Sequence, residues 1–254
     1  MAKKKTTKKK KQPAAPLPST DVHSTDYPVF EEEQVPFAES AFEGAEFVDN
    51  PEPRCPCVLL LDTSSSMSGK PIEELNEGLK FFQEELLKDE LAAKRVELAV
   101  VAFGPVRVAS EFQTPDLFTP PELVAEGHTP MGEAVERAVE LIDERKQTYR
   151  ANGINYYRPW IFLLTDGSPT DPWEKAAKLI QKGEQEGHFA FFPVGVQQAN
   201  MDVLAKFGSR APLKLKGLRF QELFSWLSRS LQKVSQSQLG SEVALPAPSG
   251  WTAV

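Results

Sequence analysis

Oxygen-bearing side chains follow two apolar stretches of the sequence at the point where each stretch ends. Asp62 ends the run CVLLLD at 57–62, Ser64 and Ser66 come directly after it, and Asp166 follows the apolar run that begins at 159. Thr129 stands in a third segment, GHTPMG, just before a helical pattern. Carboxylates and hydroxyls without a thiolate select a hard cation rather than zinc, with Mg²⁺ first and Mn²⁺ or Ca²⁺ as alternatives.

The spacing within the first segment fits a single cation. In an extended turn, positions two apart point the same way, so Asp62, Ser64 and Ser66 face one ion while the residues between them face away. Because hydroxyls carry no charge, they leave much of the positive charge of such an ion uncompensated. The ion then favours an anionic oxygen from another molecule. The pattern therefore suits a site that holds the carboxylate of a partner.

Strands and helices alternate along the chain in the pattern of a doubly wound fold. Continuous apolar runs predict buried strands at 57–62, 96–104, 159–167 and 188–196, and the alternating segment 106–114 predicts an antiparallel edge strand. Helices are predicted at 71–90, 131–149, 171–187, 200–208 and 220–236, with a last edge strand at 212–217. We expect an α/β, Rossmann-like fold: a mostly parallel sheet with one antiparallel edge strand and helices on both faces. Ligands of such folds bind at the carboxyl ends of the strands, where the oxygen-rich residues stand.

Charge divides the 254 residues unevenly. Residues 1–20 hold seven lysines and no acid, so the remainder is more acidic than the formal net charge of −7 indicates. We expect a disordered Lys-rich tail at 1–20, a mostly disordered acidic linker at 21–52, a globular domain at 53–238 and a loose C-terminal tail at 239–254. An acidic domain argues against nucleic acid as its main partner, whereas the lysine tail could contact anionic partners.

Composition also predicts the compartment. The chain has no run of about 18 apolar residues that would span a membrane, and no apolar segment follows the N-terminal lysines as in a secretory signal. Its two cysteines, Cys55 and Cys57, are separated by one residue, which makes a disulfide between them strained. We interpret them as reduced thiols and expect a cytoplasmic protein.

Three segments together resemble a known family. LLLDTSSSMSG resembles the D-x-S-x-S signature of the metal-ion-dependent adhesion site of von Willebrand factor type A domains. GHTPMGEAV is similar to the loop that supplies the threonine of that site, and IFLLTDGSP to the strand that supplies its second aspartate. The resemblance covers roughly 55–236. It implies that Ser64, Ser66 and Thr129 are metal ligands and that Asp62 and Asp166 act directly or through water.

The nearest subgroup by resemblance is that of bacterial stand-alone domains related to tellurite-resistance proteins, to which GKPIEELNEGL and TPMGEAVERAVELI are similar. Some members carry a C-terminal zinc module, for which this chain has no cysteines. The resemblance implies a setting in bacterial stress response or in kinase- and phosphatase-linked signalling.

The function we expect is a metal-dependent protein–protein interaction module that binds an acidic residue of its partner, and not an enzyme. SMSGKP lacks the upstream glycine and the hydroxyl residue after the lysine of a phosphate-binding loop. Asp62 lacks the second aspartate two positions on that a haloacid-dehalogenase-type phosphatase needs, and no G-x-S-x-G motif occurs. A metal-dependent phosphohydrolase and a scaffold with a vestigial metal site remain the alternatives.

Residues beside the expected ligands have more ordinary interpretations. Thr129 could cap the helix that follows it and bind the metal as well. Asp171 is expected to cap the helix 171–187, with Glu174 closing a capping box. Thr165 is expected to face the core or to support the site, and His128 to be solvated.

Overall fold

The computed structural model describes residues 47–248, 250 and 252–253. The chain divides into two units, Met1–Phe37 and Ala38–Val254, and every described residue belongs to the second. The predicted Lys-rich tail and most of the predicted acidic linker therefore lie outside the described residues. No helix of the described part is long and apolar enough to cross a membrane.

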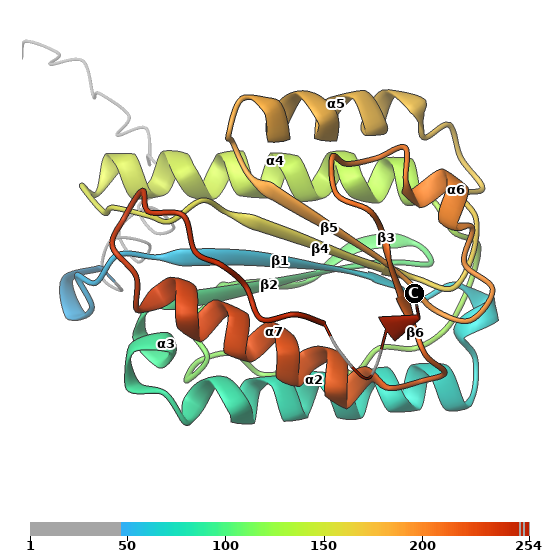
Figure 1. Ribbon diagram of the computed structural model, residues 1–254, viewed down its shortest axis with the longest axis horizontal. Coiled ribbons are helices and arrows are strands. Elements are labelled where there is room, and N and C mark those ends of the chain that lie inside the picture. The colour runs from blue at the N-terminus through green and yellow to red at the C-terminus, as the bar shows by residue number, and fades with distance from the viewer. Residues whose placement is uncertain (1–46, 249, 251, 254) are drawn as a thin grey trace, which may run out of the picture. The chain divides into compact units, whose positions relative to one another are not determined.

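The predicted α/β fold is confirmed (Figure 1). A seven-stranded sheet has the order β3-β2-β1-β4-β5-β6-β7, with parallel pairing from β2 through β6. The strands are β1 (Cys55–Asp62), β2 (Val96–Phe103), β3 (Val106–Gln113), β4 (Trp160–Thr165), β5 (Ala190–Gly195), β6 (Leu213–Leu215) and β7 (Thr252–Ala253).

Antiparallel strands lie at both edges of the sheet. β3 pairs antiparallel with β2, as predicted for 106–114. The structure adds a second antiparallel pairing that was not predicted, of β7 with β6, which makes β6 an inner strand. The two residues of β7 carry too little pattern to be recognised as a strand in the sequence.

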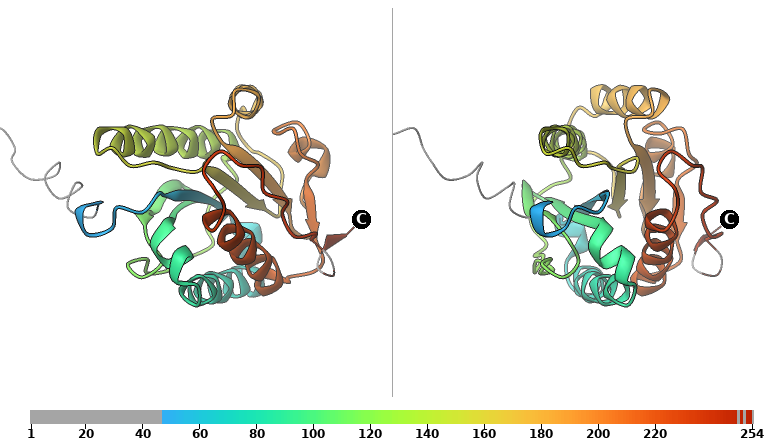
Figure 2. Two further views of the ribbon diagram at one scale, coloured as in Figure 1. Left: turned by 60° about the vertical axis from the view of Figure 1, so that its left-hand side comes forward. Right: turned by 90° about the vertical axis from the view of Figure 1, so that its left-hand side faces the viewer.

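Helices cover both faces of the sheet (Figure 2). The helices α2 (Lys70–Leu87), α3 (Glu90–Arg95) and α7 (Phe220–Ser235) lie on one face, and α4 (Met131–Ala151) and α5 (Glu174–Gln185) lie on the other. The shorter elements are η1 (Ser65–Met67) and α6 (Met201–Leu204). The helix predicted at 71–90 is observed as α2 and ends at Leu87. A second short helix that was not predicted, α3, follows it, and the Asp89 carboxylate caps α3 by accepting a hydrogen bond from the Ala92 amide (2.8 Å).

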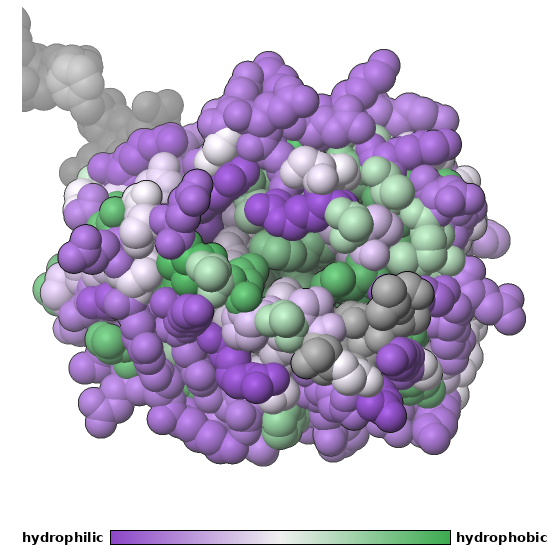
Figure 3. Space-filling model, in the orientation of Figure 1, coloured by the Kyte–Doolittle hydropathy of each residue, from purple (hydrophilic) through white to green (hydrophobic). Residues whose placement is uncertain are grey.

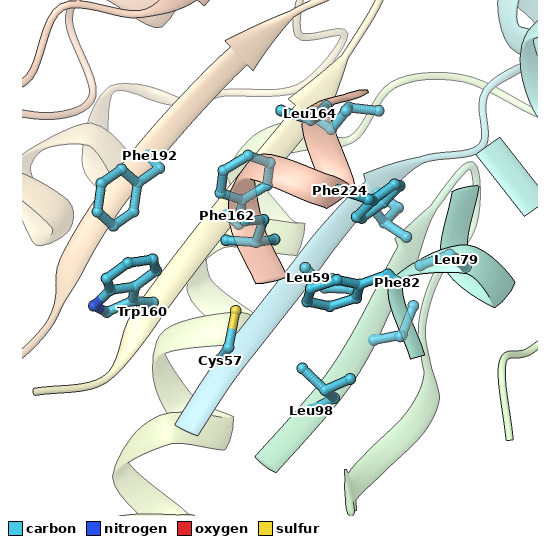
Figure 4. Packing of buried hydrophobic residues seen from close by; sticks show 14 of the residues in the cluster. Cys57, Leu59, Leu79, Phe82, Leu98, Trp160, Phe162, Leu164, Phe192 and Phe224 are labelled. Atoms are coloured by element: carbon cyan, nitrogen blue, oxygen red, sulfur yellow. The ribbon is translucent and has the colours of Figure 1, made fainter. Parts of the chain in front are cut away.

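Alternation along β1 builds two cores, one on each face of the sheet. Leu59 and Leu61 face α2 and α7, whereas Val58 and Leu60 face α4 and α5. Figure 4 shows part of the first core, in which Phe82 and Phe224 have ring centroids 5.2 Å apart. Because both faces of β1 are covered, all eight of its residues are buried, as the continuous apolar run predicts.

Both cysteines of β1 are free and buried. Burial raises the pKa of Cys55 to about 12, and it raises the pKa of Cys57 well above the ordinary thiol value. Both side chains therefore remain protonated thiols at neutral pH, in agreement with the interpretation of reduced cysteines.

A buried charge network closes the amino end of the central strands. The Arg54 Nε and the Arg145 Nε donate to the two carboxylate oxygens of Glu97, at 2.7 and 2.8 Å, and the Tyr149 hydroxyl also donates to Glu97. The Phe47 ring lies 5.2 Å from each of the two guanidinium carbons. Residue 47 falls within the predicted acidic linker, so the end of that segment is part of the folded unit.

A second carboxylate, that of Glu184, joins α5 to β5 and to the loop before β6. It accepts hydrogen bonds from the amides of Phe191 (3.0 Å) and Ser209 (2.6 Å) and pairs with Arg210. Burial alone would raise the pKa of Glu184, but these hydrogen bonds and the Arg210 charge outweigh it and lower the pKa below its usual value.

The C-terminal segment, predicted as a loose tail, lies against the domain over its described part. Val243 and Leu245 pack on the core beside α7. The Trp226 indole N–H donates to the Pro246 carbonyl oxygen at 2.8 Å, which fixes the segment along the helix.

Candidate metal site

The site lies where the strand order reverses. From β1 the chain goes to β2 and β3 on one side and then returns to β4 on the other, so β1 and β4 are neighbours at the switch point. Asp62 ends β1, and Asp166 follows the end of β4 at Thr165. The two carboxylates thus leave adjacent strands at the same edge of the sheet, where ligands bind in this class of fold.

Asp62 is the deepest residue of the cluster. Its side chain is fully buried, and its Oδ1 accepts a hydrogen bond from the Ser64 amide at 2.8 Å. Its Oδ2 accepts a hydrogen bond from the Thr165 hydroxyl. Burial raises the pKa of the Asp62 carboxyl and the charge of Asp166 raises it further, whereas the hydrogen bonds from Ser64 and Thr165 act in the opposite direction.

A chain of hydrogen bonds runs from this buried end to the surface. The Ser64 and Ser66 hydroxyls lie 2.9 Å apart, and the Ser66 hydroxyl donates to Asp166 Oδ1 at 2.7 Å. Ser64 and Asp166 are buried, with 3% and 6% of their surface exposed, whereas Ser66 is exposed. The oxygens of these side chains are therefore hydrogen-bonded in a row, and Ser66 is the member that solvent reaches.

Thr129 stands in the loop before α4 and lies close to the loop that follows β4. A Cβ built on Gly167 would lie 3.6 Å from the Thr129 Oγ1, so this hydroxyl lies beside the backbone that carries Asp166. The Thr129 amide donates to the Thr170 Oγ1 at 3.1 Å, and the Thr129 carbonyl accepts from the Thr170 amide at 2.9 Å. These two bonds hold the Thr129 backbone against the loop that follows β4.

The loop after β1 is clamped to the loop before α4 by main-chain hydrogen bonds. The Glu126 amide donates to the Thr63 carbonyl at 2.7 Å, and the Ser65 amide donates to the Gly127 carbonyl at 3.2 Å. A Cβ at Gly104 would lie 2.3 Å from the Glu126 oxygen and 2.7 Å from the Thr63 oxygen, so only glycine permits this approach.

Two capping predictions near the site were wrong. α5 begins at Glu174 without a side-chain cap, and the Asp171 carboxylate caps α4 instead, accepting from the amides of Gly132 (3.0 Å) and Glu133 (2.8 Å). Thr129 makes no cap either, since Pro130 is the N-cap residue of α4. A carboxylate from the loop after β4 has taken the capping role.

Of the five residues singled out in the sequence, hydrogen bonds link four in a row, Asp62, Ser64, Ser66 and Asp166, and Thr129 lies beside Gly167, the residue after Asp166. The five together offer two carboxylates and three hydroxyls, a donor set that fits a hard divalent cation. The described residues contain no group of three or more His, Cys, Asp or Glu side chains able to hold a metal.

A recess of about 660 Å³ adjoins Thr129. The residues that line it come from the loops after β2, before α4 and after β4 and from the starts of β3 and α4: Gly104, Pro105, Val106, Glu126, Gly127, His128, Pro130, Glu133 and Thr170. His128 is exposed, as expected from the sequence.

Comparison with known families matches residues 57–221 to the model of the von Willebrand factor type A domain. The chain belongs to the von Willebrand factor type A domain family. Domains of this family are in general protein-interaction modules, and the resemblance stated from the three sequence segments is confirmed at the level of the family.

Solved structures share the type A fold with this chain at low identity. Proximal thread matrix protein 1 from the mussel byssus is 18% identical with a TM-score of 0.50, and the alignment covers 71% of this chain and 48% of that one. The pilus adhesin SpaC from Lactobacillus rhamnosus GG is 11% identical with a TM-score of 0.59, with 72% and 30% covered. The chain thus spans less than half the length of either. Comparison with curated proteins gave no match.

Several residues that build the site were missed or only half recognised in the sequence. Thr165 was expected to face the core or to support the site, and its bond to Asp62 shows the supporting role. Thr170 and Gly104 were not singled out. The available signals were a threonine five residues after the apolar run of β4 and a glycine at the end of β2. Neither signal points to its partners, which lie 22 to 41 residues away in the sequence.

Proposed function

We propose that this type A domain is a metal-dependent protein-interaction module. Asp62, Ser64, Ser66, Thr129 and Asp166 would hold a divalent cation, with Mg²⁺ preferred over Mn²⁺ or Ca²⁺. When bound, the cation would supply an open coordination position for the carboxylate of an acidic residue on the partner protein.

One observation carries the proposal: the hydroxyls of Ser64 and Ser66 form a continuous hydrogen-bonded chain that ends on Asp166 at the switch point of the sheet. Because Ser66, the middle member of this chain, is exposed, the chain is accessible to a partner from solvent. Because only two of the five donors carry charge, a divalent ion held there would keep its attraction for an external anion.

The recess beside Thr129 would provide a contact surface for the partner. Residues flanking the carboxylate of the partner would lie against the Glu126–His128–Glu133 side of this recess. Its two glutamates favour a partner with basic residues next to the acidic one.

A binding assay on the full chain tests the proposal. Peptides containing Asp or Glu are compared with matched Asn or Gln peptides, each in Mg²⁺ and in EDTA. We expect retention only for acidic peptides in Mg²⁺, and its loss in Ser66→Ala but not in Ser68→Ala, because Ser68 is exposed in the same loop and is not one of the proposed ligands. Equal retention in EDTA, or of the amide peptides, would contradict the proposed mode of binding.

The same variants separate this proposal from its alternatives. A metal-dependent phosphohydrolase would turn over an aryl phosphate in Mg²⁺, and this turnover would disappear in Asp62→Ala. A scaffold with a vestigial site would bind neither the metal nor the acidic peptides. We propose a non-enzymatic module because the family consists in general of interaction domains.

We further propose a cytoplasmic setting in a bacterial cell, in stress response or in kinase- and phosphatase-linked signalling. The support is the similarity of GKPIEELNEGL and TPMGEAVERAVELI to the tellurite-resistance-type domains. Mg²⁺-dependent co-purification of the tagged chain with a kinase or phosphatase would support this setting, and association that ignores Mg²⁺ would argue against it.

A further inference from the structure

The C-terminal segment runs along α7 in the opposite direction to the helix (Figure 1). We call its described part, residues 243–248, 250 and 252–253, the strap. Three side chains of the α7 region hold it: Arg219, Trp226 and Lys233. Their donors reach the carbonyl oxygens of residues 250, 246 and 244, at 3.1, 2.8 and 2.6 Å.

The three donors form one row along the helix. They are seven residues apart, close to two helical turns, so they project from one side of α7. From Arg219 to Lys233 the helix rises about 21 Å. Their acceptors, the carbonyls of residues 250, 246 and 244, follow in the opposite order along the chain. The helix therefore presents a row of hydrogen-bond donors to a segment that runs antiparallel to it.

All three of these bonds are made to the main chain of the strap. These bonds therefore depend on the backbone of the strap and not on the identity of its side chains. The last described part adds as β7 to β6, with Leu215 opposite Thr252 and Lys214 opposite Ala253. Strand addition to a sheet edge combined with backbone-directed donors is a recurrent way for proteins to bind peptides.

The strap does not fill the space beneath it. A cavity of about 300 Å³ remains between the strap and the domain. On the domain side, Phe192, Leu213, Trp226 and Arg210 line it, and on the strap side residues 245–248 do. Figure 3 shows a hydrophobic recess on this face of the molecule. A volume of this size is at the lower end of ligand-binding pockets, and its lining is mainly apolar and aromatic.

We propose that the surface of α7, β5 and β6 on which the strap lies is a groove for an extended, apolar, proline-containing segment of another protein. The strap of the same chain occupies this groove when the partner is absent. The strap itself shows the chemistry that fits: residues 243–248, VALPAP, contain no charge. The remaining cavity indicates that the preferred partner has a larger apolar side chain at the position of Pro246. This inference involves none of the five residues of the candidate metal site.

Peptide exchange on the complete chain tests the proposal. A protease recognition sequence replaces the exposed loop at 238–241, so that the folded protein can be cut while the strap stays in place. A fluorescent peptide with the sequence of residues 243–254 is then added, and its anisotropy is measured. We expect the cut chain to take up the peptide, the uncut chain to take up at least tenfold less, and a peptide with leucine for Pro246 to bind several-fold more tightly.

Two variants on α7 control this measurement. Trp226→Phe keeps an aromatic ring but removes the N–H that reaches the strap, and it should weaken uptake several-fold. Arg229→Ala removes an exposed guanidinium of the same helix that donates to Ser225 within the helix, and it should leave uptake unchanged.

Four results would overturn the proposal. Loss of the folded circular-dichroism signal on cutting would make the strap an integral part of the core. A folded, cut chain that takes up no peptide would show that the strap cannot be exchanged for another segment. Weaker binding of the leucine peptide would contradict the inferred partner chemistry. Concentration-dependent dimers of the uncut chain that the peptide dissociates would identify a second copy, not another protein, as the occupant.

Discussion

Replacing the buried carboxylate of Glu97 with an amide gives the largest change in stability that we expect from a single polar group. Glu97 and Arg54 are each only 1% exposed, and Arg54 Nε and Arg145 Nε both donate to Glu97. Glu97→Gln keeps the shape of the side chain but leaves two buried or half-buried guanidinium groups without the charge that they share. Removing one partner of a buried ion pair costs about 3–5 kcal/mol of folding free energy.

This cost converts to a measurable shift in the melting temperature. For a domain of this size, 1 kcal/mol corresponds to about 2–4 °C, so Glu97→Gln should melt about 6–20 °C below the wild type. Thermal and urea unfolding followed by circular dichroism measure the change. Glu77→Gln is the matched control, because its ion pair with Lys80 is 61% exposed on both sides and should change the melting temperature very little.

The reasoning is refuted if Glu97→Gln unfolds within about 1 kcal/mol of the wild type, the range of an exposed ion pair. Such a result would mean that water or a rearranged side chain compensates the two arginines. Metal binding should be unchanged in this variant, since Glu97 lies at the amino end of β2 and the candidate site lies at the carboxyl ends of the strands.

Three further predictions follow from buried groups. The pKa of Glu184 is lower in the folded state than in the unfolded one, so its contribution to stability is complete above a pH of about 4.3 and is lost as the pH falls through the folded pKa. Glu184→Gln should therefore make the acid-induced loss of stability shallower in urea melts taken between neutral and acidic pH. An unchanged dependence of stability on pH would contradict this. Burial raises the pKa of Cys55 and Cys57, so both thiols should be unreactive toward an aromatic disulfide reagent in the native protein and reactive after unfolding. Rapid labelling of the native protein would refute this prediction. Gly78→Ala would place a Cβ 2.7 Å from Phe224, between α2 and α7. Urea unfolding should show that the free energy of unfolding falls by about 1 kcal/mol or more, despite the better helix propensity of alanine. A rise in the free energy of unfolding would show that the Phe224 ring moves freely.

The sequence predicts the parts of the fold that rest on long, regular patterns. β1 and β4 are continuous apolar runs because both faces of each strand are covered, and their ends place Asp62 and Asp166 at the switch point. The site residues could be grouped because three loops of a parallel sheet meet at one edge. Their roles as metal ligands remain a prediction.

The parts that could not be predicted depend on contacts between distant segments. Asp171 has the sequence signature of a cap for the helix that follows it, but in the fold its carboxylate meets the first turn of α4, 39 residues earlier. The network around Glu97 joins residues 43 to 52 positions apart, and nothing near Glu97 in the sequence indicates a buried charge. The sequence predicts a loose tail at the strap because the strap contacts α7 through its main-chain carbonyls, and main-chain hydrogen bonds do not require a particular pattern of side chains.

Calorimetric titration of the full chain with Mg²⁺ and with Mn²⁺ tests the central claim most directly. The wild type is compared with Ser66→Ala, which removes the hydroxyl that joins Ser64 to Asp166, and with Ser68→Ala as the control in the same loop. We predict saturable binding of at least one of these ions to the wild type and to the control, and its loss in Ser66→Ala with the fold intact. Binding that is unaffected by Ser66→Ala, or no binding to any of the three proteins at millimolar ion, would contradict the proposed metal site.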